Sequence, residues 1–451
     1  MTSFDAVSLF SNCGAGDLGY QKAGFTFAVL AELVDFRLEV AQLNHPDAWG
    51  IEGDLRETLP DVIKCWHDLK SGQQPDLLSA CPPCQGMSSA RGGRGLITDP
   101  KAGSRDPRNL LVEVVALAVK ELRPKIVVVE NVAMFLTRQV HHPRTKKAVS
   151  AAAFLVEELL PDYVVYPMVS DLADFGIPQS RKRSFLTFVR RDSTIVERLG
   201  GEHLIPYPIP THENAHINLA SALNDMNLPE LDASTRELAR DPERDLHQVP
   251  VWSKEAYRMV AAIPANSGKT AWQNNLCPSC GTSESTGEMA RCPKCRELLL
   301  RPIVMDESGE YRLIKGFKNS SYSRMHPDRP AATITTASGR VGSDNTIHPS
   351  ENRLLSLLEC SVLQTFPDDF DWGETLSMRG TTHLRGMIGE AVPPKFTASH
   401  GAVLRTLLEG RTSEGMMTER DMRCIRACAV LKRVMGSDAA FEHLSPSAVR
   451  A

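Results

Sequence analysis

The chain has 451 residues, of which 42% are hydrophobic, and a formal net charge of -4. The length exceeds that of one ordinary domain, and the apolar content is enough for a sizeable core and a smaller second unit. The weak net charge gives no global indication of nucleic-acid binding, so such binding would depend on local basic patches. Candidate patches are Arg181-Lys182-Arg183, Arg190-Arg191 and the segment 91–108. Because charged runs are usually solvated surface, these patches are supporting evidence only.

The sequence also lacks the marks of a membrane or secreted protein. It contains no run of about 18 apolar residues, and Met1-Thr2-Ser3-Phe4-Asp5 lacks the basic-then-apolar layout of a signal peptide. The eleven cysteines, four of them in two late C-x-x-C pairs, fit a reducing compartment better than a disulfide framework. We therefore expect a cytoplasmic protein without membrane association.

The first predicted strand, residues 6–10, leads into a glycine-rich turn over residues 11–19. Such a turn between a strand and a helix lets a nucleotide-like ligand approach the backbone and the helix N-terminus. Many tight turns share this pattern, so it is a weak signal alone. The next predicted strand, residues 25–31, ends at Glu32, in the position where a carboxylate commonly binds ribose hydroxyls.

A helical segment at residues 36–43 precedes a third strand that ends near residues 51–55, and the apolar run 75–78 predicts a fourth. This fourth strand leads to Cys81-Pro82-Pro83-Cys84, followed by a glycine- and arginine-rich segment. Two prolines fix the backbone before Cys84, which suits a nucleophile at the carboxyl end of a strand. A redox pair or half of a metal site is an equally open interpretation of this C-x-x-C alone.

The pattern continues with a helix at 109–121 and a continuous apolar strand at 124–132 that contains Glu130. Such a strand is buried on both faces and would bring Glu130 to the same sheet edge as Cys84, although a helix-capping role is also open. A helix at 148–160 and strands at 163–169 and 184–189 follow. This alternation predicts an α/β fold with a doubly wound, mostly parallel sheet over residues 1–191.

From residue 192 the sequence becomes proline-rich and irregular, and we place a domain boundary there. Two C-x-x-C pairs, separated by eleven residues, follow at Cys277, Cys280, Cys292 and Cys295. This spacing is suited to tetrahedral binding of Zn²⁺ by four thiolates, and four cysteines leave no open position, so the site would be structural. Four unrelated thiols are the alternative.

The remaining chain is expected to return to the first domain. We assign residues 192–376 to the second domain, 377–410 to a returning segment with a helix through residue 408, and 411–451 to a helical tail. Cys424 and Cys428 would share one face of the tail helix, where burial is a better explanation than a site.

The order of these motifs resembles that of the DNA cytosine-C5 methyltransferase family over residues 6–400. The turn after Phe10 is similar to the family's AdoMet-binding motif, and Pro83-Cys84-Gln85 is similar to its nucleophile motif. The family's Glu-Asn-Val and Gln-x-Arg-x-Arg motifs match residues 130–132 and 179–183, and its last two motifs match 329–335 and 389–394.

The resemblance implies an AdoMet-dependent enzyme in which Cys84 is the nucleophile, Glu130 contacts cytosine N3, and Arg181 and Arg183 lie near a flipped base. The implied contacts to AdoMet, with Glu32 on the ribose and Asp54 on the adenine, are Phe10, Asn12, Gly14, Leu18, Glu32, Leu33, Asp54, Leu55, Pro83, Glu390 and Val392. Residues 192–328 correspond to the variable target-recognition region, and the cysteine pairs are not part of the family's common pattern.

Three residues depart from the family pattern. Asn12 stands where a glycine is usual, although asparagine tolerates positive φ better than most residues. Ala15 replaces a second glycine, and Glu390 replaces the customary asparagine of the last motif. The carboxylate of Glu390 is expected to weaken AdoMet binding.

We expect a monomeric, nucleoid-associated enzyme that methylates a flipped cytosine in duplex DNA within a restriction-modification or phage-defence system. A tRNA methyltransferase of the same family is one alternative, although its recognition region would be much smaller. A catalytically silent DNA-binding regulator is another, made conceivable by Asn12 and Glu390. The segment 86–108, with its arginines, is expected to close over the site.

Overall fold

The structure is a computed structural model that describes residues 3–83, 110–142, 144–145, 147–316, 320–343 and 345–445. Cys84 and the predicted closing segment 86–108 lie outside the described residues. Among the described helices, none is both long and apolar enough to cross a bilayer.

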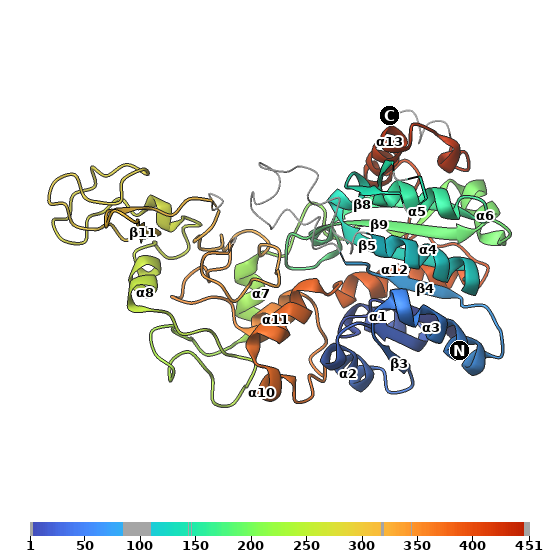
Figure 1. Ribbon diagram of the computed structural model, residues 1–451, viewed down its shortest axis with the longest axis horizontal. Coiled ribbons are helices and arrows are strands. Elements are labelled where there is room, and N and C mark those ends of the chain that lie inside the picture. The colour runs from blue at the N-terminus through green and yellow to red at the C-terminus, as the bar shows by residue number, and fades with distance from the viewer. Residues whose placement is uncertain are drawn as a thin grey trace.

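A sheet of seven described strands forms the centre of the first domain, in the order β3-β2-β1-β4-β5-β9-β8 (Figure 1). The strands are β1 (Phe4–Leu9), β2 (Phe25–Glu32), β3 (Trp49–Glu52), β4 (Leu77–Ala80), β5 (Ile126–Val132), β8 (Tyr163–Asp171) and β9 (Lys182–Arg190). β9 runs antiparallel to both of its neighbours, whereas the pairs among β3, β2, β1, β4 and β5 are parallel. The predicted mostly parallel α/β fold is therefore confirmed.

Helices alternate with these strands because each connection between parallel neighbours requires a crossover. They are α1 (Ala15–Lys22), α2 (Asp35–Asn44), α3 (Leu55–Lys70), α4 (Leu111–Leu122), α5 (Ala151–Leu159), α6 (Thr194–Glu202) and α12 (Pro394–Leu408). Helices α3, α4 and α5 pack side by side, whereas α1 packs against α12, which comes from the far end of the chain. The small strands β6 (Gln139–His141) and β7 (Ala148–Ser150) pair before α5.

The second domain has little regular structure and extends away from the sheet, with α8 and β11 farthest from it (Figure 1). Its elements are α7 (Leu219–Met226), α8 (Lys254–Ala261), β11 (Ile303–Met305), β12 (Tyr311–Leu313) and α9 (Leu357–Leu363), and α10 (Thr375–Arg379) and α11 (Thr381–Glu390) follow where the chain returns to the first domain. Helix α11 was not expected. It ends before Ala391-Val392-Pro393, so the last motif joins two helices instead of starting one.

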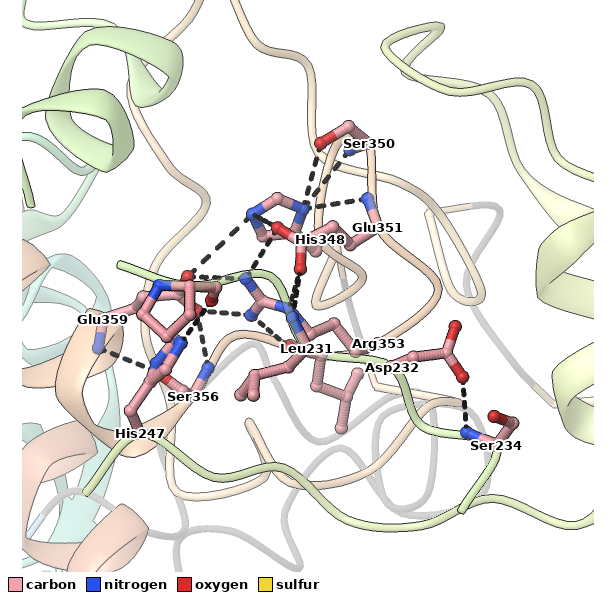
Figure 2. Close-up of polar contacts among 12 residues, drawn as sticks. Leu231, Asp232, Ser234, His247, His348, Ser350, Glu351, Arg353, Ser356 and Glu359 are labelled. Carbon is pink, nitrogen blue, oxygen red and sulfur yellow. Dashed lines mark hydrogen bonds and ion pairs between the residues drawn. The ribbon is translucent and has the colours of Figure 1, made fainter. Parts of the chain in front are cut away.

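A buried cluster of charged groups lies at the N-terminal end of α9 (Figure 2). The Arg353 guanidinium donates to both oxygens of Glu359, at 2.6 and 2.8 Å, and to Glu351. Burial acts to raise the pKa of Glu359, but hydrogen bonds from Arg353 outweigh it and hold that pKa at about 2. Burial lowers the pKa of the neighbouring His348 to about 4. Ser356 and Glu359 form a capping box at the N-terminus of α9, which links this cluster to the helix.

The first domain's core does not end at residue 191. Ile195, Leu199, Ile205 and Tyr207 are buried in the same apolar cluster as the sheet. The Tyr207 hydroxyl donates to the backbone carbonyl of Tyr166 on β8 at 2.6 Å. We therefore propose that the first domain continues through β10 (Leu204–Pro208).

The C-terminal tail completes this core. It contains a strand, β13 (Met416–Thr418), before the predicted helix, α13 (Met422–Met435), and β13 pairs antiparallel with β10. Helix α13 packs against β8. Cys424 and Cys428 are buried with their Sγ atoms 3.9 Å apart, as the packing interpretation predicted.

Leu431→Ala tests whether the tail stabilises the first domain. Leu431 is fully buried in the first core, so its truncation is expected to lower the free energy of unfolding by about 2–5 kcal/mol. Met422→Ala on the same helix is the matched control, because Met422 is 49% exposed and should change stability by less than about 0.5 kcal/mol. Chemical denaturation measures both, and equal effects would argue against a stabilising tail.

Candidate active site

The predicted site residues gather where the parallel strands end. Strand β1 leads to the glycine-rich turn, β2 ends at Glu32, and β4 leads to Cys81-Pro82-Pro83. Glu130 lies near the end of β5, and Arg183 lies at the start of the antiparallel β9, in register with Val132. Open α/β sheets bind ligands at this edge.

Three residues of the glycine-rich turn have positive φ angles. Phe10, Asn12 and Gly14 have φ angles of 60°, 51° and 73°, and asparagine tolerates such a positive φ better than most residues. A Cβ atom at Gly14 would lie 2.8 Å from the His45 ring. The turn thus requires glycine at that position both for φ and for space.

Glu32 closes this turn through its carboxylate. It accepts hydrogen bonds from the backbone N–H groups of Asn12, at 2.9 Å, and Val34, at 3.2 Å. The residue is buried, and burial raises the pKa of its carboxyl group, an effect that nearby Arg37 opposes. A buried carboxylate held in one orientation suits ligand groups that donate hydrogen bonds, such as ribose hydroxyls.

Asn12 contributes a second polar group to the turn. Its Nδ2 donates to the backbone carbonyl of Met387 on α11 at 2.9 Å. Its Oδ1 is buried and has no hydrogen-bond partner among the described residues. An unpaired buried acceptor beside a carboxylate fits a ligand that carries donors, as AdoMet does through its ammonium and ribose hydroxyl groups.

Glu390, the other departure from the family pattern, is paired. Its carboxylate accepts from Arg37 on α2 at 2.6 Å. Val392, two residues later, is buried and would meet a Cβ atom at Gly16 at 3.2 Å. The expected extra negative charge of Glu390 therefore has a compensating guanidinium.

The other predicted cofactor residues differ in their surroundings. Asp54 caps α3 by accepting from the Arg56 backbone N–H at 2.9 Å, and the Arg56 side chain lowers the pKa of Asp54. Leu55 is buried, Leu18 and Pro83 are partly buried, and Leu33 is 60% exposed. A role for Asp54 at adenine stays a prediction.

The segment that leads to Cys84 is held by Asn131. The Asn131 side chain donates to the backbone carbonyl of Pro82 at 3.0 Å, and the Cys81 N–H donates to the Leu9 carbonyl at 3.3 Å. The last described residues before the predicted nucleophile are therefore fixed to both β5 and β1. Cys84 itself lies outside the described residues.

Glu130 and Arg183 form an ion pair, with Arg183 Nε 2.8 Å from a carboxylate oxygen of Glu130. Both side chains are largely buried, at 11% and 13% exposure. A charge-assisted hydrogen bond of this kind fixes the direction of the carboxylate. The structure thus brings two of the predicted catalytic residues together, one strand away from the Cys81-Pro82-Pro83 segment.

Arg181 has a different environment. Its side chain is buried, and its terminal nitrogens donate to the backbone carbonyls of Ile334, Gly389 and Ala391 at 2.9–3.0 Å. These contacts connect the residue just before β9 with the second domain and with the last motif. They support a positioning role for Arg181, and its predicted place beside the reacting base stays a prediction.

Sequence reasoning missed Arg37 and the bond from Asn131 to Pro82. Arg37 lies in the first turn of an amphipathic helix, where an arginine resembles ordinary solvated surface. The Glu-Asn-Val motif includes Asn131 but does not indicate that its side chain bonds to Pro82. Arg37 could be found by looking for a charged partner of Glu390, but the distance between these two residues is not contained in the sequence.

A model of the C-5 cytosine-specific DNA methylase family matches residues 4–404. The chain belongs to this family. A Type II methyltransferase of Haemophilus parahaemolyticus is 28% identical over 413 residues, which cover 91% of this chain and 88% of the relative. A Type II methyltransferase of Avibacterium volantium is 26% identical over 86% of this chain and 94% of the relative.

Solved structures share the fold. A methyltransferase of Entamoeba histolytica has a TM-score of 0.52 at 13% identity, and the match covers 90% of this chain and 99% of that chain. A candidate DNA modification methyltransferase encoded in an Escherichia coli prophage has a TM-score of 0.53 at 19% identity, with coverage of 90% and 100%. The match to the family model confirms the predicted family, so the chain is a DNA cytosine-C5 methyltransferase by family.

The four predicted metal ligands also meet in space. The Sγ atoms of Cys277, Cys280, Cys292 and Cys295 all lie within 4.8 Å of one another. Each C-x-x-C turn closes in the same way, since the N–H of Gly281 donates to the Cys277 carbonyl and that of Arg296 to the Cys292 carbonyl. The cluster could hold a metal ion.

Asp17→Asn tests a buried carboxyl group behind the glycine-rich turn. Asp17 accepts from the Ser8 hydroxyl at 2.8 Å, and burial raises its pKa from 3.8 to about 7. The folded state therefore retains this proton where the unfolded chain has lost it, so this group's contribution to stability falls as pH rises from about 4 to 7.

The variant removes this titration. Between pH 5 and 7, the free energy of unfolding of the wild type should fall, relative to the variant, by up to about 1.4 kcal/mol per pH unit. Urea denaturation across that range measures the difference. Parallel pH profiles for the two proteins would contradict the assignment.

Proposed function

We propose that this protein transfers a methyl group from AdoMet to C5 of a flipped-out cytosine in duplex DNA, through a covalent adduct with Cys84. The observation that carries the proposal is the Glu130–Arg183 ion pair, which lies next to the anchored segment that leads to Cys84. The family match supports the reaction class.

The chemistry explains why these residue types are needed. The Cys84 thiolate attacks C6, forming the S–C6 bond, and the electron pair of the C5–C6 double bond makes C5 nucleophilic. Glu130, directed by Arg183, stabilises the ring at N3 by a hydrogen bond or a proton. After methylation, loss of the C5 proton to a base, with water as a candidate, restores the double bond and expels the thiolate.

AdoMet supplies an electrophilic methyl group on its sulfonium. The residues proposed to hold it are the turn from Phe10 to Gly14, Glu32 on the ribose, Asp54 on the adenine and the segment around Val392. The support is the fixed carboxylate of Glu32 and the unpaired buried Oδ1 of Asn12. Both are acceptors, as a ligand with hydroxyl and ammonium donors requires.

The second domain is proposed to recognise the target sequence and to help hold the duplex while the base is flipped, at a cost of a few kcal/mol. We also propose that the enzyme belongs to a restriction-modification system, because its relatives of matching length are Type II methyltransferases. Which DNA sequence it reads depends on side chains that contact base edges.

The test is transfer of a labelled methyl group from AdoMet to duplex DNA and, in parallel, to tRNA. Wild type is expected to produce 5-methylcytosine in DNA, and Cys84→Ala should reduce the label to background. Glu130→Gln should lower kcat by about 10²- to 10⁴-fold, since general acid catalysis contributes that much. Glu121→Gln, on the exposed end of α4, is the matched control.

Each alternative outcome has a definite meaning. Label only in tRNA would assign the protein to an RNA-methylating branch. Binding of DNA without methyl transfer would favour a catalytically silent regulator. Full activity in Cys84→Ala would exclude the covalent mechanism.

We further propose that the four clustered thiols bind a structural Zn²⁺. Tetrahedral sites made of four cysteines hold zinc with no open position, and the two symmetrical turns bring their thiols together without a helix or a long strand to support them. A metal ion would therefore stabilise the distal part of the second domain.

Metal analysis of freshly purified, reduced protein should find about one Zn²⁺ per chain. Cys292→Ser should lose the metal and lower the unfolding temperature of the second domain. Cys65→Ser, a thiol on α3 outside the cluster, should retain both. Wild-type protein without metal would overturn the assignment.

A further inference from the structure

Two contacts connect helix α11 to the cofactor side of the first domain, and both involve departures from the family pattern. Asn12 donates to the carbonyl of Met387, and Arg37 donates to Glu390 at the last position of α11. The residues are far apart in sequence, so each contact fixes the last motif against the glycine-rich turn. We call these two contacts the α11 latch.

Arg37 pairs with one carboxylate and acts on the charge of a second. Its terminal nitrogen is 2.6 Å from Glu390, and its positive charge also opposes the rise in the pKa of Glu32, whereas Glu390 adds to that rise. Without Arg37, two negative groups would face each other at the cofactor turn. Repulsion would act on the end of α11 and on the hydrogen bonds of Glu32.

The latch also determines the orientation of the Asn12 amide. Because Met387 offers a carbonyl oxygen, the side chain must present its NH₂ group there. Its Oδ1 is then left as a buried acceptor of the turn that has no hydrogen-bond partner among the described residues. A shift of α11 would therefore disturb both Asn12 Oδ1 and the Glu32 carboxylate, the two acceptors assigned to the cofactor.

We propose that Arg37 is a positioning residue of the AdoMet site, which permits glutamate at position 390 and holds α11 so that Glu32 and Asn12 present their acceptors to the cofactor. This inference rests on the proposed AdoMet-dependent function. It assigns a role to a residue outside the recognised motifs, and it explains how Glu390 is accommodated in the last motif.

A purely stabilising role is the competing explanation, and the exposures argue against a large one. The side chains of Arg37 and Glu390 are 20% and 31% exposed. Ion pairs that water reaches contribute little to folding, about 0–1 kcal/mol. Removing Arg37 should thus leave the protein folded and alter the cofactor site.

The experiment measures binding of AdoMet and of its demethylated product, S-adenosylhomocysteine, by calorimetry without DNA. Arg37→Ala should weaken both by about fivefold. The double variant Arg37→Ala/Glu390→Asn should recover to within about twofold of wild type, because it removes both charges of the pair, and Glu390→Asn alone completes the double-mutant cycle. In kinetics, Arg37→Ala should raise the KM for AdoMet and leave the KM for DNA and kcat nearly unchanged.

Arg379→Ala is the matched control. Arg379 forms the other ion pair near this end of α2, with Asp35 at 3.3 Å, and that pair is more exposed. Its removal should leave affinity for both ligands unchanged. Thermal unfolding without ligand, measured for every variant, reports any general loss of stability.

The outcomes separate this inference from the proposed function. Wild type that binds neither ligand would refute the AdoMet-dependent function itself. Wild-type binding that Arg37→Ala leaves unchanged, or that Glu390→Asn fails to rescue, would overturn the role of Arg37. Tighter binding of the cationic AdoMet alone in Arg37→Ala would show a simple charge effect in place of positioning.

Discussion

The buried guanidinium of Arg181 links the sheet of this enzyme to its second domain and to the last motif. Its terminal nitrogens donate to the carbonyls of Ile334, Gly389 and Ala391, where each unpaired carbonyl would cost about 1–3 kcal/mol. Gln179 reinforces the same junction through the carbonyl of Leu363. Because the candidate active site lies at the sheet edge beside this junction, its geometry depends on Arg181.

The cofactor side and the catalytic side of the site share this support. Strand β9 begins after Arg181, and Arg183 reaches Glu130 across the sheet. The last motif, anchored by Arg181 at its carbonyls, also places Glu390 beside Arg37. The short segment that contains Arg181 and Arg183 therefore helps to position both the Glu130 carboxylate, which is proposed to contact N3, and helix α11, which borders the cofactor turn.

The second domain is stabilised differently because it has few strands and helices. Ion pairs and hydrogen bonds among buried groups replace regular backbone ladders near α9, where Arg353 joins two glutamates (Figure 2). At the distal end, the four thiols meet beside Leu299, and two of them belong to a small buried cluster with it. Such a domain can vary its loops while retaining a fixed junction with the sheet, which suits the proposed role in target recognition.

The sequence by itself determined the alternation of strands and helices, the glycine-rich turn and the cysteine pairs, because these depend on local backbone preferences and spacing. The positive φ at Asn12 was found in the structure, and the sequence showed only that the residue there tolerates it. Only the tertiary structure decided which charges meet. Arg37 with Glu390, Arg181 with the last motif and the tail with β10 join residues distant in the chain, and their partners follow from packing that no local pattern encodes.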